Sequence, residues 1–205
     1  MSIRADRSSR PYRVLDLPWV YETAQAVLAP GQRMKITAAL RAAASALPPP
    51  HRVLDVGCGP ASWLWNIGLR PVGLDITESY VAQFREQGDA SVVGSCVTLP
   101  FATGSFDQAW SVGLLHHLTD QMARDTIAEM LRVVGPSGAV LIVDAVLPRS
   151  ALTRPLAYVL RKLDRGGNVR TEAEHRALFG AGWQTTRHLM AYNGLEFTFS
   201  VLAPR

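Results

Sequence analysis

RVLDVGCGPASW, residues 52–63, joins an apolar run to a pair of glycines. The pattern predicts a buried strand over RVLDV, a tight turn at Gly57 and Gly59, and a helical stretch that starts near Ala61. Glycines at such a turn let the backbone approach a ligand, and the N–H groups at the start of the following helix can bind an anion. The stretch therefore predicts a ligand site at the end of this strand, with Asp55 just before the glycines.

A second carboxylate, Asp75, lies twenty residues beyond Asp55 and near the end of the apolar run PVGLDI. A carboxylate at the end of a second strand can accept hydrogen bonds from both hydroxyls of a ribose, so the two motifs together predict a nucleoside site. The dinucleotide fingerprint GxGxxG requires a third glycine where this sequence has Ser62. Ser62 argues against a nicotinamide cofactor, although a nicotinamide-dependent oxidoreductase stays open as an alternative function.

Strand-like and helical stretches alternate through the middle of the chain. The predicted strands after the first are residues 71–76, 91–95, 106–115 and 138–147, and the predicted helices are residues 77–88 and 119–135. This alternation predicts an α/β fold with a parallel sheet, helices on both faces and the ligand at the carboxyl ends of the strands. Residues 183–192 and 194–203 read as two further strands joined by the hairpin signal Asn193-Gly194.

The motif DVGCGPA, residues 55–61, resembles the first motif of the class I S-adenosylmethionine-dependent methyltransferases of small-molecule type. The resemblance continues through GLDIT, GSCVTLPF, FDQAWSVGLLHHL and VGPSGAVLIVDAV, and so covers residues 52–147 in the order of that family. It implies a Rossmann-like fold with a mostly parallel seven-stranded sheet and a C-terminal antiparallel hairpin. It also implies S-adenosylmethionine as the cofactor and methyl transfer to a small organic or lipid-like acceptor. A non-catalytic S-adenosylmethionine-binding subunit is a further alternative.

The resemblance also assigns residues to the cofactor site. The acid matching Asp75 holds the ribose, the glycines matching Gly57 and Gly59 line the methionyl part, and the residue matching Ile76 packs on the adenine. Ser95 and Cys96 stand where the family usually has an aspartate that contacts the adenine amine. The residues expected at the cofactor are Asp55, Gly57, Cys58, Gly59, Asp75, Ile76, Ser95, Cys96 and Ser111. The sequence shows no metal-ligand spacing.

His116 and His117 follow the fourth predicted strand, at the ligand end of the sheet, and are the candidate catalytic acid-base residues. The alternative is a packing and hydrogen-bonding role, because the LHHL motif occurs in the family regardless of acceptor. Asp144, late in the fifth strand, is expected either to touch an acceptor or to cap the segment after the strand. His175 lies in a predicted exposed helix and is expected to be a surface residue.

Residues 1–50 are expected to form a helical cover over the cofactor and acceptor. The tetrad RVLD recurs at residues 13–16, but LPWVYE follows it, without a glycine to admit a ligand. Trp19 and Tyr21 are therefore placed over the pocket as substrate-binding residues, or else they dock this helix on the sheet. The cover belongs to one predicted domain, residues 1–205, together with a cofactor-binding core (51–147), a helical insert (148–170) and a C-terminal helix and hairpin (171–205).

The insert contains an amphipathic helix, predicted over residues 151–163. One face carries only apolar side chains: Leu152, Leu156, Val159, Leu160 and Leu163. Such a face usually packs on the helix's own domain. The alternative is an acceptor lid or a surface for an anionic lipid, so peripheral membrane contact stays open.

Composition limits the class of protein. The 205 residues are 48% hydrophobic, and no apolar run reaches the ~20 residues that span a bilayer. With no apolar signal-peptide stretch and only two cysteines, a cytoplasmic protein is expected. The formal charge is +4, but no nucleic-acid-binding motif accompanies it, so no nucleic-acid partner is expected. The sequence leaves the oligomeric state undetermined.

Overall fold

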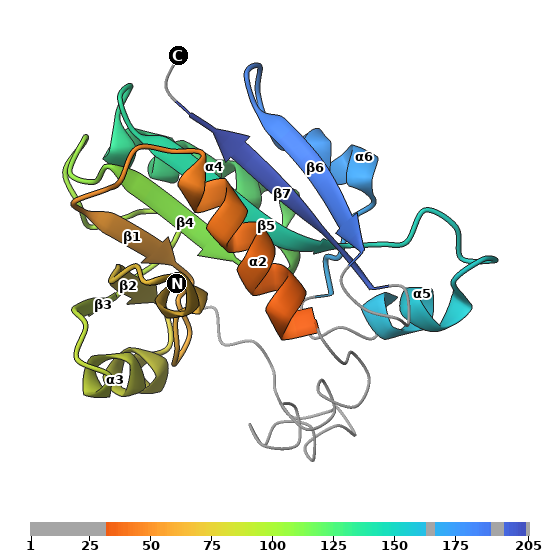
Figure 1. Ribbon diagram of the computed structural model, residues 1–205, viewed down its shortest axis with the longest axis horizontal. Coiled ribbons are helices and arrows are strands. Elements are labelled where there is room, and N and C mark those ends of the chain that lie inside the picture. The colour runs from red at the N-terminus through yellow and green to blue at the C-terminus, as the bar shows by residue number, and fades with distance from the viewer. Residues whose placement is uncertain (1–31, 163–166, 190–194, 204–205) are drawn as a thin grey trace.

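The computed structural model describes residues 32–162, 167–189 and 195–203, which contain a seven-stranded sheet in the order β3-β2-β1-β4-β5-β7-β6 (Figure 1). Neighbouring strands are parallel from β3 to β5, and β7 is antiparallel to β5 and β6. The strands are β1 (Val53–Val56), β2 (Val72–Asp75), β3 (Ser91–Val93), β4 (Gln108–Val112), β5 (Ala139–Val146), β6 (Gln184–Leu189) and β7 (Glu196–Leu202). This confirms the expected fold. The predicted Asn193-Gly194 turn lies outside the described residues.

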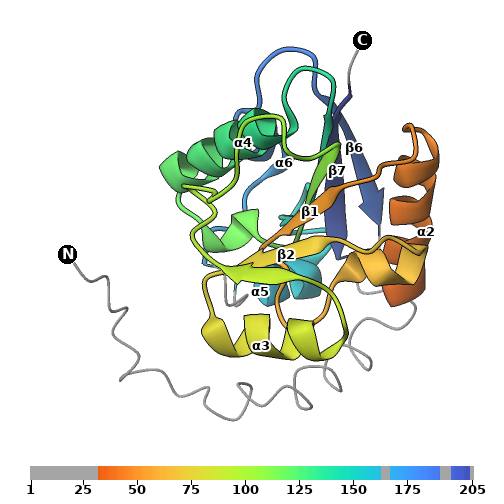
Figure 2. The same ribbon diagram turned by 90° about the vertical axis from the view of Figure 1, so that its left-hand side faces the viewer.

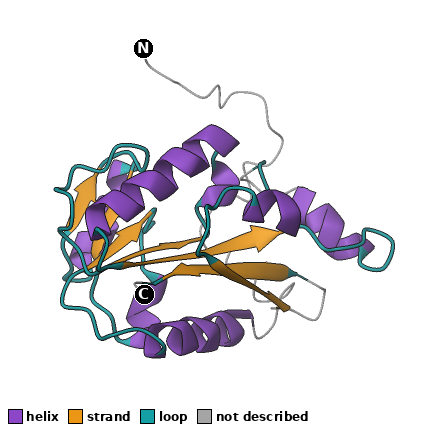
Figure 3. Ribbon diagram, turned by 90° about the horizontal axis from the view of Figure 1, so that it is seen from above, coloured by secondary structure: helices purple, strands orange, loops and turns teal. Residues whose placement is uncertain are grey.

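Helices cover both faces of the sheet (Figures 2 and 3). The helical elements are α2 (Gln32–Ser45), α3 (Glu78–Glu86), α4 (Asp120–Val134), α5 (Pro155–Lys162), α6 (Glu172–Arg176) and the 3-10 turns η2 (Trp63–Ile67) and η3 (Leu115–His117). Successive residues of β1 face opposite sides, because side chains alternate along a strand. Val53 packs with residues of α2, whereas Leu54 packs with residues of α4. Each face of the sheet therefore has its own hydrophobic cluster.

One local prediction in this part of the chain needs correction. The helical stretch expected from Ala61 is only the 3-10 turn η2, which ends at Gly68 with φ 84°. Few residues separate Pro60 from Gly68, which is too short a span for a stable α-helix. Of residues 1–50, expected to form a helical cover, the structure describes residues 32–50, which contain α2, and residues 1–31 lie outside the described part.

The expected surface position of His175 is wrong, because its side chain is only 1% exposed. Helix α6 begins at a capping box formed by Thr171 and Glu174, and His175 in this helix is buried. With five residues in α6, the sequence offered no periodicity from which to assign the inward face.

The expected packing of the insert helix is wrong for three of its apolar residues, whereas Leu160 is partly buried and packs against Ala157 and Leu195. In α5 and the turn before it, Leu152, Leu156 and Val159 are exposed, and the buried side chains are Ala157 and Arg161. Leu163 lies outside the described residues. No helix in the described ranges combines the length and apolar character needed to span a membrane.

Candidate cofactor and acceptor site

The glycine corner after β1 is built as the sequence predicts. Gly57 and Gly59 have φ values of 73° and 60°, in the left-handed region that glycine adopts without strain. The backbone N–H groups of Gly57 and Cys58 both donate to the carbonyl oxygen of Leu74, at 2.8 and 3.1 Å. A Cβ on Gly57 would lie 2.8 Å from Leu114, whereas a Cβ on Gly59 would meet nothing within 4 Å. The open side of the corner is therefore at Gly59.

Asp75 lies directly against this corner. Its Oδ2 accepts the N–H of Gly59 at 3.0 Å, and its Oδ1 accepts the N–H of Thr77 at 2.8 Å. The carboxylate is thus held in place by two backbone donors and keeps further lone pairs for ligand hydroxyls. The next residue, Ile76, is 74% exposed and offers an apolar surface beside the carboxylate.

Asp55 is buried beneath the corner, and its Oδ2 accepts the hydroxyl of Ser62 at 2.5 Å. Burial raises the pKa of Asp55 to about 6, and the neighbouring charge of Asp75 acts in the same direction, while the Ser62 hydrogen bond lowers it. The Ser62 hydroxyl also accepts the N–H of Leu64 and so caps η2. The residue that departs from the dinucleotide fingerprint therefore has a structural role of its own.

Cys58 presents its backbone to the corner, while its side chain is buried toward β2. A Cβ on Gly73 would lie only 2.8 Å from the Cys58 sulfur, so the turn after β1 packs closely on β2 there. Burial, with the charges of Asp55 and Asp75, raises the pKa of the Cys58 thiol. The thiol is a packing group.

The residues expected near the adenine lie in the loop after β3. Ser95 and Cys96 are half-buried, and the preceding Gly94 donates its N–H to the backbone carbonyl of Asp75 at 2.9 Å. The loop is therefore anchored beside Asp75. Ser111, in β4, is fully buried, and its hydroxyl has no hydrogen-bond partner among the described residues. An unpaired buried hydroxyl is costly and marks a place where a ligand or water can bind.

A histidine–aspartate pair joins β5 to the turn after β4. The Nδ1 of His116, in η3, lies 2.5 Å from the Oδ1 of Asp144, which is fully buried in β5. Burial raises the pKa of Asp144, but the charge and hydrogen bond of His116, the charge of His175 and the N–H of Ala145 outweigh it, so the pKa is lowered. Asp144 is thus a buried anion that orients His116.

With Nδ1 facing Asp144, the other ring nitrogen of His116 is Nε2, and an imidazole can exchange protons at both nitrogens. His117 is exposed, and its ring centroid lies 4.1 Å from that of His116. The sequence did not pair His116 with Asp144. The available signal was a single acid inside the otherwise apolar strand AVLIVDAV, since a buried charge needs a partner.

Arg170 holds the turn that carries the histidines, and sequence reasoning missed it. Its guanidinium donates to the carbonyl oxygens of Leu115 and Leu118, at 2.8 and 2.7 Å, and to Asp120 at 2.8 Å. The only sequence signal was its place in an arginine-rich segment, which does not distinguish it from surface arginines.

Behind the pair lies His175, whose Nε2 is 3.4 Å from the hydroxyl of Ser200. Burial lowers the pKa of His175, although the charge of Asp144 opposes this.

Trp19 and Tyr21, predicted to face the acceptor, lie outside the described residues. Within the described ranges, no cluster of three histidine, cysteine or acidic side chains could hold a metal ion.

Comparison with known proteins identifies a domain over this site. Residues 54–142 match a family described as a methyltransferase domain. A tRNA (carboxymethyluridine(34)-5-O)-methyltransferase of Arabidopsis thaliana is 37% identical over 101 residues, covering 47% of this chain and 24% of that protein. A 2-methyl-6-phytyl-1,4-hydroquinone methyltransferase of Synechocystis is 34% identical over 107 residues, covering 48% and 33%. This chain therefore spans well under half of either relative's length.

Solved structures share the fold at low sequence identity. A Pyrococcus horikoshii protein superposes with a TM-score of 0.67 at 18% identity, covering 90% of this chain and 98% of that one. A possible histamine N-methyltransferase of Thermotoga maritima superposes with a TM-score of 0.68 at 16% identity, covering 92% and 97%. Because the similar proteins include tRNA methyltransferases, the expectation of no nucleic-acid partner has no support from these comparisons.

Proposed function

We propose that this chain is a class I methyltransferase, as the match of residues 54–142 to a methyltransferase domain supports. In this proposal it transfers a methyl group from S-adenosylmethionine to a small organic or lipid-like acceptor that must lose a proton, such as a hydroxyl. The observation that carries the proposal is the joint placement of the glycine corner, the Asp75 carboxylate and the His116–Asp144 pair at the carboxyl ends of β1, β2, β4 and β5.

The residues at the corner fit the cofactor. Asp75 offers a carboxylate for the ribose hydroxyls, Ile76 offers an exposed apolar side chain for the adenine, and the backbone at Gly59 is open to the methionyl part. Asp55 supplies a buried acid beneath the corner, where a cationic ligand group favours its ionised form. When bound, S-adenosylmethionine supplies an electrophilic methyl group on its sulfonium.

His116 is the proposed general base. With Nδ1 held by Asp144, its Nε2 accepts the acceptor's proton, and the buried carboxylate stabilises the imidazolium that forms. A base of this kind contributes about 10²–10⁴-fold to the rate, and positioning contributes much of the rest. Asp144 is therefore a positioning residue, while His117, which is exposed, is the candidate for contact with the acceptor.

A second candidate acceptor is a nucleoside of tRNA, favoured by the 37% identity to a relative named for that reaction. The proposed base would serve either acceptor, so the geometry does not separate them. Ser62 stands where the dinucleotide fingerprint has a glycine, and it binds Asp55 and caps η2, which argues against the nicotinamide-dependent alternative. A non-catalytic cofactor-binding subunit is distinguished from an enzyme by measuring catalytic turnover.

Calorimetry with S-adenosylhomocysteine and with NAD tests the cofactor. We expect binding of S-adenosylhomocysteine and not of NAD, and a loss of at least about tenfold in affinity for Asp75→Ala, because a charged hydrogen bond contributes about 1.5–3 kcal/mol. Asp125→Ala, which removes an acid from α4, is the matched control and should bind normally. Equal affinity of Asp75→Ala and the native protein would refute the site.

Transfer of a labelled methyl group tests the acceptor and the base. Small phenols, prenylated quinols and bulk tRNA are the acceptors to compare, and product with tRNA alone would favour the second candidate. His116→Gln should lose turnover by about 10²-fold or more while keeping S-adenosylhomocysteine affinity. His117→Gln is measured in the same way, so that the loss of turnover at His117 can be compared with that at His116. Binding of the cofactor without transfer to any acceptor would instead indicate a non-catalytic subunit.

A further inference from the structure

Helix α5 presents its apolar side chains to solvent. Leu152, in the turn before the helix, is 94% exposed, and Leu156 and Val159 are 56% and 50% exposed. Leu156 and Val159 are three positions apart and so lie on one side of the helix, and Leu152 precedes them in the turn; these three exposed residues are called here the α5 stripe. An amphipathic helix of a globular protein normally buries such a stripe.

Polar contacts hold the helix in this orientation. Arg161 points inward, where it donates to the backbone carbonyl of Glu196 at 3.2 Å and lies 4.6 Å from the centre of the Phe197 ring. Arg154, at the start of the helix, forms an ion pair with the Glu196 carboxylate. The exposure of the α5 stripe is therefore built into the way α5 attaches to β7.

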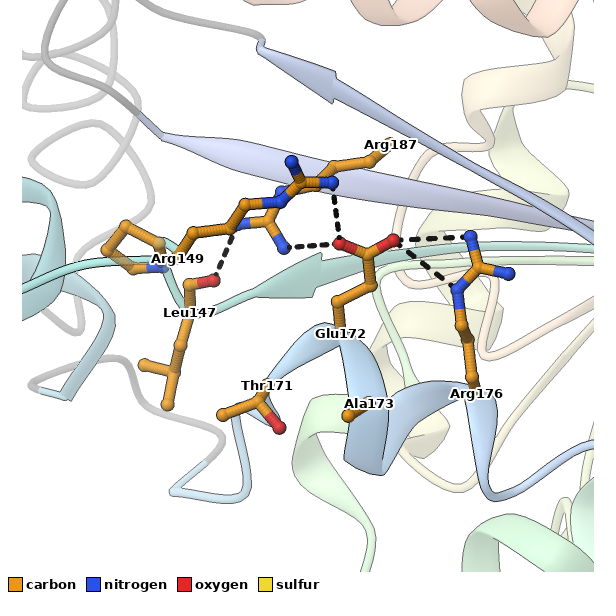
Figure 4. Close-up of a pocket in the computed structure, with 8 residues that line it drawn as sticks. Leu147, Arg149, Thr171, Glu172, Ala173, Arg176 and Arg187 are labelled. Atoms are coloured by element: carbon orange, nitrogen blue, oxygen red, sulfur yellow. Dashed lines mark hydrogen bonds and ion pairs between the residues drawn. The ribbon is translucent and has the colours of Figure 1, made fainter.

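Helices α5 and α6 and strand β6 lie toward the right of Figure 1, and α6, β6 and the loop after β5 each contribute arginines to one cluster. Glu172 binds three of them, Arg149, Arg176 and Arg187, at 3.1–3.2 Å (Figure 4). Arg187 also binds Glu196, which pairs with Arg154. Four arginines thus share two carboxylates, leaving an excess of two positive charges.

This arginine cluster borders a cavity of about 400 Å³ at the base of the loop that carries Leu152. Arg149 is the most open of its members, with 75% of its side chain exposed. Lys162, at the end of α5, is exposed next to the stripe. An apolar stripe beside excess positive charge is the chemistry of a surface that lies on an anionic bilayer.

We propose that α5 and the loop over residues 147–154 dock the protein on an anionic lipid bilayer. The α5 stripe enters the acyl boundary, while Lys162 and the exposed members of the arginine cluster, Arg149 and Arg176, bind lipid phosphates. Such docking stands apart from methyl transfer, and it would bring the enzyme to acceptors dissolved in the membrane. The excess charge favours a bilayer over a second copy of this chain, since two like-charged surfaces repel.

The test is co-sedimentation of the full chain with phosphatidylcholine vesicles, with and without phosphatidylglycerol as one third of the lipid. We expect binding only to the anionic vesicles, and weaker binding as salt is raised. Leu152→Glu/Leu156→Glu should lower the vesicle affinity by at least about tenfold. Met122→Glu, which places the same charge at an exposed apolar position on α4, should leave it unchanged. Arg149→Ala should lower it about fivefold.

Several results would overturn the proposal. One is absence of binding to anionic vesicles, and another is equal binding by the stripe variant and the native chain. A dimer in light scattering that Leu156→Glu converts to monomer would show that a second copy covers the stripe. S-adenosylhomocysteine affinity, measured on the same variants, reports separately on the proposed function and is expected to stay constant.

Discussion

The buried carboxyl group of Asp55 should make this protein less stable as the pH rises, and Asp55→Asn tests that expectation. Burial raises the pKa of Asp55 from 3.8 to about 6, so the folded state binds this proton more tightly than the unfolded chain does. The contribution of Asp55 to the free energy of unfolding therefore falls as the pH rises from about 4 to about 6. A shift of about two units corresponds to a loss of about 3 kcal/mol, which is complete once the pH is well above the folded-state pKa.

Asparagine keeps the shape of Asp55 without the charge, and its amide oxygen can accept the Ser62 hydroxyl. We expect Asp55→Asn to exceed the native protein in unfolding free energy by up to about 3 kcal/mol near pH 8, with no difference below about pH 4. Urea denaturation followed by tryptophan fluorescence at several pH values measures this. A difference that does not change with pH, or a less stable variant near pH 8, would refute the reasoning.

Asp107 provides a control of opposite sign. The N–H groups of Arg52 and His51 both donate to its Oδ2 at 2.7 Å, and the hydrogen bond from Arg52 is the main cause of its lowered pKa. An acid with a lowered pKa stabilises the fold above its unfolded pKa, and this stability is lost as the pH falls. Asp107→Asn should therefore lower the unfolding free energy near neutral pH, in contrast to Asp55→Asn.

Gly57→Ala should destabilise the fold more than Gly59→Ala in the same urea measurement. Both residues have a positive φ, which costs alanine about 1–2 kcal/mol at either site. Only at Gly57 would the new Cβ also require Leu114 to move. Equal losses would show that Leu114 yields without cost. Asp144→Asn removes the anion that orients His116, so it should lower kcat by about 10²-fold or more and leave S-adenosylhomocysteine affinity unchanged. An unaltered pH profile of turnover would argue against His116 as the base. Since the pKa of Asp144 is lowered, its contribution to stability should be lost as the pH falls below about 4, and acid titration of Asp144→Asn should lack that loss.

Local sequence patterns were sufficient to predict the glycine corner and the position of Asp75. A strand, a glycine turn and an acid at the end of the next strand are each written in a few consecutive residues. The parallel pairing of β1 with β2 then brings Asp75 to the N–H of Gly59. The expected order of strands and helices is confirmed for the same reason, since alternating elements with short connections leave few ways to form a parallel sheet.

Predictions failed where burial depends on the rest of the chain. The orientation of α5 is set by Arg154 and Arg161 against Glu196, which follows more than thirty residues later in the sequence. A hydrophobic stripe in the sequence could not show that these anchors would turn it outward. His175 was assigned to the surface for a related reason, because its helix is too short to reveal which side meets the sheet.

By itself, the sequence determined the fold class, the glycine corner and the acid at the end of β2, because those features depend on residues that are neighbours along the chain. Only the tertiary structure decided that His116 and Asp144 form a pair, and that Arg170 holds the turn beneath them. These contacts join η3 to β5 and to the segment before α6, and no pattern along one segment encodes a contact between side chains that meet only when the sheet is assembled.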